Sequence, residues 1–257
     1  MIDFAAKKGF ICDMDGVIYH GNNLLPGALD FVNRLKKSEK KFLFLTNSSK
    51  LSPRELSQKL ARMGLTVGES HFYTSALATA RFLSMQAPGC SVFAIGDSGL
   101  TNALYDRGIN MNDVDPDYVV VGETQNYNYD LIIKAVGLIN KGAKLIGTNY
   151  DLTGPTEQGL VPATRALVSP IELATGVSAY FVGKPNPLIM RTGKKLLGCD
   201  SEDTVIIGDN MDTDIIAGVE SGIDTVLVLS GVSTVETPLN YAYRPTCVLD
   251  GVGDIII

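Results

Sequence analysis

Short apolar runs alternate with longer amphipathic stretches along the whole chain of 257 residues. Each apolar run has the length of a strand that is buried on both faces, and each amphipathic stretch has the spacing of a helix with one apolar face. Strands and helices that alternate in this way are typical of an α/β fold with a parallel sheet. The predicted strands are 10–14, 42–46, 72–74, 92–96, 118–121, 145–148, 180–182, 204–208 and 225–229.

Prolines and charged residues mark the ends of the predicted helices. The amphipathic stretch 26–37 begins at Pro26 and ends with two lysines, which predicts a helix with proline in its first turn. Ser52-Pro53-Arg54-Glu55 combines an N-cap, a first-turn proline and an acidic residue, and predicts a helix that ends near Gly64. Two further helices are predicted over 127–140 and 187–197.

Composition narrows the class of protein. The net charge is −6 and the lysine clusters are short, so nucleic acid is not expected as a partner. No apolar run reaches the length that spans a membrane, and the N-terminus lacks the long apolar core of a secretion signal, so no membrane association is expected. The four cysteines are widely spaced. They predict free thiols in the reducing cytoplasm.

The most informative polar positions lie at the end of the first predicted strand, in Asp13-Met14-Asp15-Gly16. Because side chains alternate along a strand, Asp13 and Asp15 are expected to start on the same side of it. Two buried carboxylates without a counter-charge would cost several kcal/mol. A positive group is therefore expected between them. A divalent metal is the first candidate, and phosphate chemistry is its most obvious use.

Three more polar sites follow predicted strands or lie at their ends: Thr46-Asn47-Ser48, Gly183-Lys184-Pro185 and the segment 208–214, which contains Asp209. In an open parallel sheet, ligands bind beyond the carboxyl ends of the strands, where the connecting loops meet. The four sites therefore predict a single pocket at that edge of the sheet.

Each polar site suits one part of phosphoryl transfer. One carboxylate can attack phosphorus, and a second carboxyl group can protonate the departing alcohol. Magnesium prefers oxygen ligands, and Asp209 would supply a second carboxylate for it. The hydroxyl of Thr46 and backbone N–H groups at Thr46 and Asn47 would hold phosphate oxygens. Lys184 would orient Asp13 and neutralise the phosphoryl group.

The four sites together resemble a known set of motifs. Asp13 through Val17, Leu45-Thr46-Asn47, Gly183-Lys184-Pro185 and Gly208 through Asp214 are similar, in this order, to the four motifs of the haloacid dehalogenase (HAD) superfamily. The resemblance is closest to its NagD-type phosphatase branch. Supporting segments at 25–28, 72–76, 121–123, 147–151 and 229–232 extend it over essentially the whole chain.

The resemblance implies a fold and a domain organisation. It implies a Rossmann-like HAD core with a parallel sheet, formed by residues 1–86 and 180–257. An α/β cap domain over residues 87–179 would be inserted between the Thr-Asn motif and the Lys motif. In this family the cap usually chooses the leaving group, and the resemblance also implies a homodimer formed through the cap.

The resemblance further implies a role for each site residue. Asp13 is the expected nucleophile and Asp15 the expected acid/base. Asp13, the backbone carbonyl of Asp15, and Asp209 are expected to bind Mg²⁺. The remaining site residues are expected to bind phosphate (Thr46, Asn47 and Lys184), to line the site (Asn210) and to support it from behind (Asp214).

These inferences predict a Mg²⁺-dependent phosphomonoester hydrolase that forms an aspartyl-phosphate. Its substrate would be a small phosphorylated metabolite, such as a nucleotide monophosphate or a sugar phosphate. Two alternatives stay open: a regulator that binds a phosphate ester without turnover, and a phosphotransferase. The presence of both Asp13 and Asp15 favours hydrolysis over mere binding, because a sensor needs no acid/base.

The sequence also predicts roles for five residues outside the four motifs. Arg165 stands where relatives tend to have glycine or a small residue, and it is either a substrate contact or a solvent-facing cap residue. Asn149 and Asp151 are expected to stabilise a loop of the cap rather than to contact substrate. His20 and His71 have no obvious nucleophile or carboxylate partner, so structural roles are expected for both.

Overall fold

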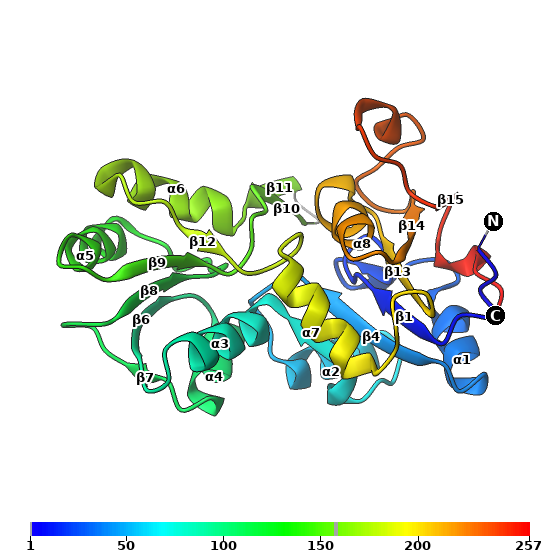
Figure 1. The fold of residues 1–257 in the computed structure, drawn as a ribbon, viewed down its shortest axis with the longest axis horizontal. Helices are drawn as coiled ribbons and strands as arrows, with labels where there is room; N and C mark the ends of the chain where they lie inside the picture. The colour runs from blue at the N-terminus through cyan, green and yellow to red at the C-terminus, as the bar shows by residue number, and fades with distance from the viewer. Residues whose placement is uncertain (1, 157–158) are drawn as a thin grey trace. The chain divides into compact units, whose positions relative to one another are not determined.

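The computed structural model describes residues 2–156 and 159–257 (Figure 1). The chain forms two compact units. The first comprises Met1–Thr46, Leu56–Tyr73 and Lys184–Ile257, and the second comprises Asn47–Glu55 and Thr74–Gly183. This division differs from the predicted segments, because helix α3 (Ser75–Gln86) packs against α4 (Ser98–Asp106) and groups with the second unit. The role of the second unit as a cap stays a prediction.

The first unit is built on a six-stranded sheet. Its strand order is β15 (Cys247–Leu249), β14 (Asp224–Val228), β13 (Thr204–Gly208), β1 (Gly9–Cys12), β4 (Lys41–Thr46) and β5 (Phe72–Thr74). The central strand β1 pairs in parallel with both β13 and β4, and every residue of β1 and β13 is buried. The carboxyl ends of these three strands therefore meet at one edge of the sheet.

Helices and short elements complete the first unit. They are the hairpin of β2 (Tyr19–His20) and β3 (Asn23–Leu24), α1 (Ala28–Lys37), α2 (Pro53–Arg62), η1 (Glu69–His71), α7 (Pro187–Leu197), η2 (Met211–Ile215), α8 (Ile216–Glu220), η3 (Thr237–Asn240) and η4 (Val252–Asp254). Glycines let two helices lie close to the sheet. A Cβ at Gly193 of α7 would lie 2.9 Å from Leu45, and one at Gly218 of α8 would lie 2.3 Å from Thr225.

The second unit has its own parallel sheet. Its strand order is β12 (Tyr180–Phe181), β9 (Lys144–Gly147), β8 (Tyr118–Val121), β6 (Ser91–Ile95) and β7 (Asn110–Met111). Helices α5 (Tyr129–Asn140) and α6 (Thr164–Thr175) cover one face of this sheet, and α3 and α4 cover the other (Figure 1). A separate hairpin joins β10 (Thr153–Thr156) to β11 (Gly159–Pro162).

The predicted α/β class with a parallel core sheet is confirmed, and a strand lies at each of the nine predicted positions. Two predicted helix starts were wrong. Helix α1 begins at Ala28 rather than Pro26, because Gly27 takes a left-handed conformation (φ 77°) immediately before it. Helix α5 begins at Tyr129, since the Asn128 side chain accepts a hydrogen bond from the backbone N–H of Leu131 and caps the helix there.

Candidate active site

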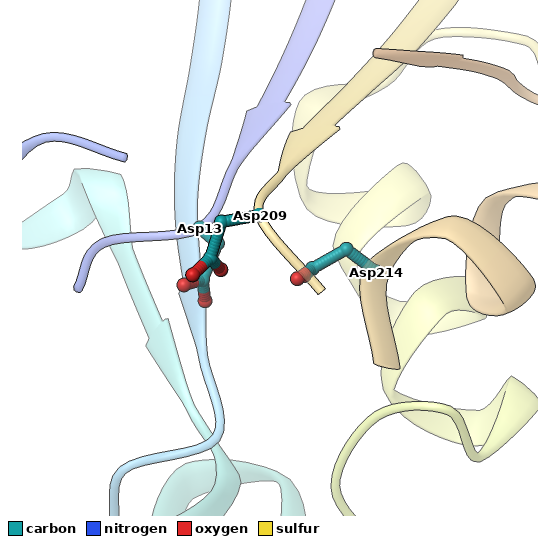
Figure 2. Close-up of side chains that lie close together, drawn as sticks. All are labelled: Asp13, Asp209 and Asp214. Atoms are coloured by element: carbon teal, nitrogen blue, oxygen red, sulfur yellow. The ribbon is translucent and has the colours of Figure 1, made fainter. Parts of the chain in front are cut away.

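Three acidic side chains converge at the carboxyl edge of the first unit's sheet (Figure 2). Asp13 follows β1, Asp209 follows β13, and Asp214 lies in η2 and approaches them from the other side. One carboxylate oxygen from each of the three lies within 4.8 Å of the other two. Parallel pairing of β1 and β13 explains why Asp13 and Asp209 are neighbours, since the two strands end side by side.

The buried ammonium of Lys184 lies among these carboxylates. Its Nζ donates to Asp13 Oδ1 at 2.5 Å, to Asp214 Oδ1 at 2.7 Å and to the backbone carbonyl of Leu45 at 2.9 Å. One ammonium against three carboxylates leaves a deficit of positive charge. A cluster of carboxylate oxygens with such a deficit fits a hard divalent cation.

Burial and mutual repulsion shift the titration of these groups. Burial raises the pKa of Asp13 well above its usual value, and Asp214 and Asp209 add to the rise against the opposing charge of Lys184. Burial, followed by the charge of Asp214, raises the pKa of Asp209 to about 7. Burial alone would lower the pKa of Lys184, but the carboxylates of Asp13 and Asp214 more than offset it, so that pKa is raised. The site is therefore short of positive charge as it stands.

Two loops hold the Asp209 carboxylate through close backbone approach. Its Oδ2 accepts a hydrogen bond from the backbone N–H of Val232 at 2.8 Å. A Cβ at Gly231 would lie 1.9 Å from that oxygen, and a Cβ at Gly16 would lie 2.4 Å from it. The hydroxyl of Ser230 donates to the Gly16 carbonyl at 2.7 Å, which joins the two loops. Segment 229–232, one of the segments that support the family resemblance, thus packs directly against the Asp209 carboxylate.

The carboxylate of Asp15 is not part of the three-carboxylate group found among the described residues. Strand β1 ends at Cys12, so the side-chain alternation of a strand does not extend to Asp15. Its Oδ1 instead lies 3.4 Å from Nδ1 of His20. The expectation that His20 has no carboxylate partner is therefore wrong. His71, in contrast, stacks on the Phe42 ring at 4.1 Å, in keeping with a structural role.

The segment that follows Asp209 is fixed by side chains distant in sequence. Asn210 Oδ1 accepts from the backbone N–H of Asp212 at 2.9 Å and so caps η2. Tyr241 donates its hydroxyl to Asp212 at 2.7 Å, and Tyr243 donates to the Met211 carbonyl at 2.9 Å. Neither tyrosine was predictable from the sequence, because nothing in their spacing links them to residues 208–214.

Thr46 ends β4 and is buried, while Asn47 belongs to the second unit. Asn47 Nδ2 donates to Asp151 Oδ2 at 2.7 Å, and Asn149 Nδ2 donates to the same oxygen at 2.6 Å. One N–H of the Asn47 side-chain amide therefore donates to Asp151 within the second unit. The phosphate-binding role of Asn47 stays a prediction.

Arg165 is held within the second unit. Its Nη1 donates to Glu172 at 2.6 Å and to Ser169 at 3.0 Å. Its guanidinium carbon lies 5.5 Å from the centre of the Tyr150 ring and 5.6 Å from that of Phe181. The side chain is 24% exposed, and both roles expected for Arg165, substrate contact and solvent-facing residue, stay predictions.

In the part of the chain that the structure describes, no helix combines the length and the apolar character needed to cross a membrane.

Comparisons with known proteins agree with the motifs. A family model described as haloacid dehalogenase-like hydrolase matches residues 10–110, and one described as HAD-hydrolase-like matches residues 181–255. The dihydroxyacetone phosphatase of Corynebacterium glutamicum (strain R) is 42% identical over 246 residues, which cover 96% of this chain and 90% of that protein. Ribonucleotide monophosphatase NagD of Escherichia coli (strain K12) is 40% identical over 248 residues, which cover 96% of this chain and 98% of NagD.

Solved structures show the same likeness in three dimensions. NagD from E. coli superposes with a TM-score of 0.91 and covers 98% of this chain and 99% of its own. The 4-nitrophenylphosphatase of Thermotoga maritima superposes with a TM-score of 0.94 at 32% identity, covering 99% of this chain and 98% of its own. The chain belongs to the haloacid dehalogenase-like hydrolases, in their NagD-type phosphatase branch.

Proposed function

We propose that the chain is a Mg²⁺-dependent phosphomonoester hydrolase that acts on a small phosphorylated metabolite through an aspartyl-phosphate. The observation that carries this proposal is the group formed by Asp13, Asp209 and Asp214 with the buried ammonium of Lys184. The relatives support the reaction class, because each is named as a phosphatase: dihydroxyacetone phosphatase, ribonucleotide monophosphatase and 4-nitrophenylphosphatase. The substrates in these names differ in their leaving group, so the substrate class of this chain is a proposal as well.

The proposed metal site uses the carboxylates of Asp13 and Asp209 and the backbone carbonyl of Asp15. The excess of buried negative charge and the oxygen donors of this edge fit a divalent cation, and Mg²⁺ is our candidate. When bound, the cation would offset the negative charge of the phosphoryl oxygens during transfer. Asp214, whose carboxylate is bonded to Lys184, would hold that lysine in place.

The proposed reaction has two steps. In the first, a carboxylate oxygen of Asp13 attacks phosphorus, the bond to the leaving-group oxygen breaks, and the carboxyl of Asp15 gives its proton to that oxygen. In the second, Asp15 takes a proton from water as this water attacks the phosphorus of the aspartyl-phosphate. Phosphate then leaves and Asp13 is restored. Lys184 orients Asp13 for attack, a role that the 2.5 Å contact between them supports.

Phosphate oxygens would be held by donors at the end of β4 and at Lys184. Thr46 would contribute its hydroxyl and Asn47 its backbone N–H, while one N–H of the Asn47 side-chain amide donates to Asp151. Backbone and hydroxyl donors of this kind stabilise charge that develops on transferring phosphoryl oxygens. Asn210 would line the same edge of the sheet from the end of η2.

The test is hydrolysis of p-nitrophenyl phosphate, dihydroxyacetone phosphate and ribonucleoside 5′-monophosphates with and without Mg²⁺. We expect Mg²⁺-dependent release of phosphate from p-nitrophenyl phosphate and from at least one metabolite, and its loss in Asp13→Asn. Asp97→Asn is a matched control, since Asp97 also follows a strand but lies at the start of α4 in the second unit. It should keep full activity.

Two outcomes would favour the alternatives. Tight binding of a phosphate ester by the intact protein without phosphate release would favour a regulator. Transfer of the phosphoryl group to an added alcohol in preference to water would favour a phosphotransferase.

A further inference from the structure

The loop that follows β14 contacts two parts of the candidate site at once. The backbone N–H of Val232 donates to Asp209 Oδ2 at 2.8 Å, and the hydroxyl of Ser230 donates to the Gly16 carbonyl at 2.7 Å. In the sheet, β14 pairs with β13 and lies two strands away from β1, the strand that precedes Gly16. The loop therefore reaches across the end of β13 and connects the segments that follow β13 and β1.

Glycine backbones bring this loop and the loop that contains Gly16 close together beside the Asp209 carboxylate. A Cβ at Gly16 would lie 3.0 Å from Gly231 Cα and 2.4 Å from Asp209 Oδ2. Gly16 has a φ of 77°, which residues with a side chain rarely adopt. The Asp209 residue is only 6% exposed. The position of its carboxylate therefore depends on both loops.

The direction of the Asp15 carbonyl is set by the same part of the backbone. The backbone N–H of Gly16 donates to the Tyr19 carbonyl at 2.9 Å. The peptide between Asp15 and Gly16 is trans, so its C=O points away from its N–H and hence away from the Tyr19 carbonyl. The residue whose carbonyl accepts from Ser230 is thus the one that directly follows the Asp15 carbonyl.

We propose that Ser230 is a positioning residue that fixes the spacing between two metal ligands, the Asp209 carboxylate and the Asp15 carbonyl. The proposal rests on the proposed function, which assigns both groups to a divalent cation. Val232 holds the first ligand directly, and the Ser230 hydroxyl holds the loop that carries the second. One loop thereby sets the positions of ligands that follow two different strands.

Fixed spacing between ligands matters more to Mg²⁺ than to a larger cation. Mg²⁺ requires near-ideal octahedral geometry with oxygen ligands at about 2.0–2.1 Å, whereas Ca²⁺ accepts flexible sets of ligands at about 2.3–2.6 Å. Without the Ser230 hydroxyl the two loops can separate, which should weaken Mg²⁺ binding more than Ca²⁺ binding. A loss of stability alone would leave the ratio of the two affinities unchanged.

The experiment is isothermal titration calorimetry of the whole chain with Mg²⁺ and with Ca²⁺, which measures binding without turnover. In Ser230→Ala we expect the Mg²⁺ affinity to fall about tenfold, as when a group that orients a metal ligand is lost, and the Ca²⁺ affinity to fall less. Ser230→Thr keeps the hydroxyl and should bind Mg²⁺ more tightly than Ser230→Ala.

Ser57→Ala is the matched control. The Ser57 hydroxyl also donates to a backbone carbonyl of the first unit, that of Val67, at 2.6 Å, and neither residue belongs to the candidate site. This variant should keep the wild-type affinities for both cations. The circular dichroism of each variant shows that it folds.

An unchanged Mg²⁺ affinity in Ser230→Ala, or losses by the same factor for Mg²⁺ and Ca²⁺, would overturn the inference while the proposed function stands. A Ser230→Thr variant no better than Ser230→Ala, or an equal loss in Ser57→Ala, would overturn it as well. If the wild type bound neither cation, the proposed metal site would fail, and the role of Ser230 with it.

Discussion

Lys184 is a buried cation between two carboxylates, and its removal leaves them without their counter-charge. Breaking a buried ion pair by removing one partner typically costs about 3–5 kcal/mol. We therefore expect Lys184→Met to lower the free energy of unfolding by about that amount and to abolish activity. Urea denaturation at neutral pH measures the first effect, and added Mg²⁺ should recover part of it.

Lys8→Met is the matched control, because it shows what the loss of a lysine at the surface costs. Lys8 pairs with Asp203 at the surface, where solvent weakens the interaction. Lys8→Met should change the free energy of unfolding far less. Similar losses in the two variants would contradict the assignment of a central electrostatic role to Lys184.

Glu123, which is not part of the Asp13–Asp209–Asp214 group, makes the free energy of unfolding depend on pH. Burial raises its pKa above the usual 4.5, and Lys50 and the hydrogen bond from Ser48 oppose the rise only in part. A raised pKa means that folding favours the protonated form. This contribution is complete below the unfolded-state pKa and is lost as the pH rises through the raised folded-state value.

The matching variant is Glu123→Gln, which keeps an oxygen to accept from Ser48 but cannot ionise. Its free energy of unfolding should gain on that of the wild type as the pH rises from about 4 to about 8. Urea denaturation across this range provides the measurement. A difference between the two proteins that stays constant with pH would show that Glu123 does not titrate in this way.

At the scale of elements, the loop after β14 shapes the site through backbone rather than side chains. A Cβ at Gly231 would lie 1.9 Å from Asp209 Oδ2, so Gly231→Ala must displace that carboxylate. Changes that misplace a metal ligand typically cost about 10–100-fold in metal affinity or activity. We expect the concentration of Mg²⁺ needed for half-maximal activity to rise by a factor of that size, with the fold retained by circular dichroism.

Gly68→Ala is the control for Gly231→Ala. A Cβ at Gly68 would approach only the Ser70 hydroxyl, at 4.0 Å, and the backbone there has an ordinary φ of −70°. This variant should bind Mg²⁺ as the wild type does. An unchanged Mg²⁺ requirement in Gly231→Ala would refute the steric argument.

In the second unit, Asp151 joins the loop after β9 to Asn47. Its Oδ2 accepts from both Asn47 and Asn149, so Asp151→Ala leaves two partly buried amides without that acceptor. The expected cost is about 1–3 kcal/mol of unfolding free energy. Asp151→Asn, which keeps one acceptor oxygen, should lose less. Equal losses in thermal or urea denaturation would show that the shared acceptor is not what stabilises this loop.

The elements that the sequence predicted well are those with strong apolar patterns. The strands β1, β8 and β13 are buried along their whole length and read as continuous apolar runs. Strands β10 and β11 were not predicted, because most of their residues are exposed and form no apolar run. They also include Gly154, Pro155 and Gly159, residue types that are rare in strands. Edge strands of this kind are fixed by pairing with a neighbour, and a local pattern does not reveal that neighbour.

The site followed the same rule. The motif residues at strand ends were predictable, because parallel strands bring their carboxyl ends to one edge. Contacts made by residues distant in sequence were not: Tyr241 on Asp212 depends on how the segment after β14 folds back. The partnership of His20 with Asp15 was overlooked although the two are close in sequence, since it depends on a two-residue strand with no apolar signature.

At the scale of the whole molecule, the three site carboxylates outnumber the one buried ammonium. We therefore predict that the free energy of unfolding depends on a bound divalent cation. A ligand that binds only the folded state stabilises it by about 2.7 kcal/mol at a hundred times its Kd. We therefore expect Mg²⁺ to raise the Tm and EDTA to reverse the rise. Asp209→Asn, which removes one carboxylate of the group, should show a much smaller rise. An identical rise in both proteins would place the stabilising cation elsewhere.

The division between the two units falls inside two of the motifs. One boundary separates Thr46 from Asn47, and another separates Gly183 from Lys184. The second unit therefore meets the first next to Thr46 and next to Lys184, two residues proposed to bind phosphate, and it carries Asn47, a third. A chimera that exchanged the second unit for that of a relative would keep Asp13, Thr46 and Lys184 in the first unit of the host chain. We propose that the second unit is the cap that chooses the leaving group, so we expect leaving-group preference to come from the relative and the phosphoryl-transfer chemistry to stay with the host chain.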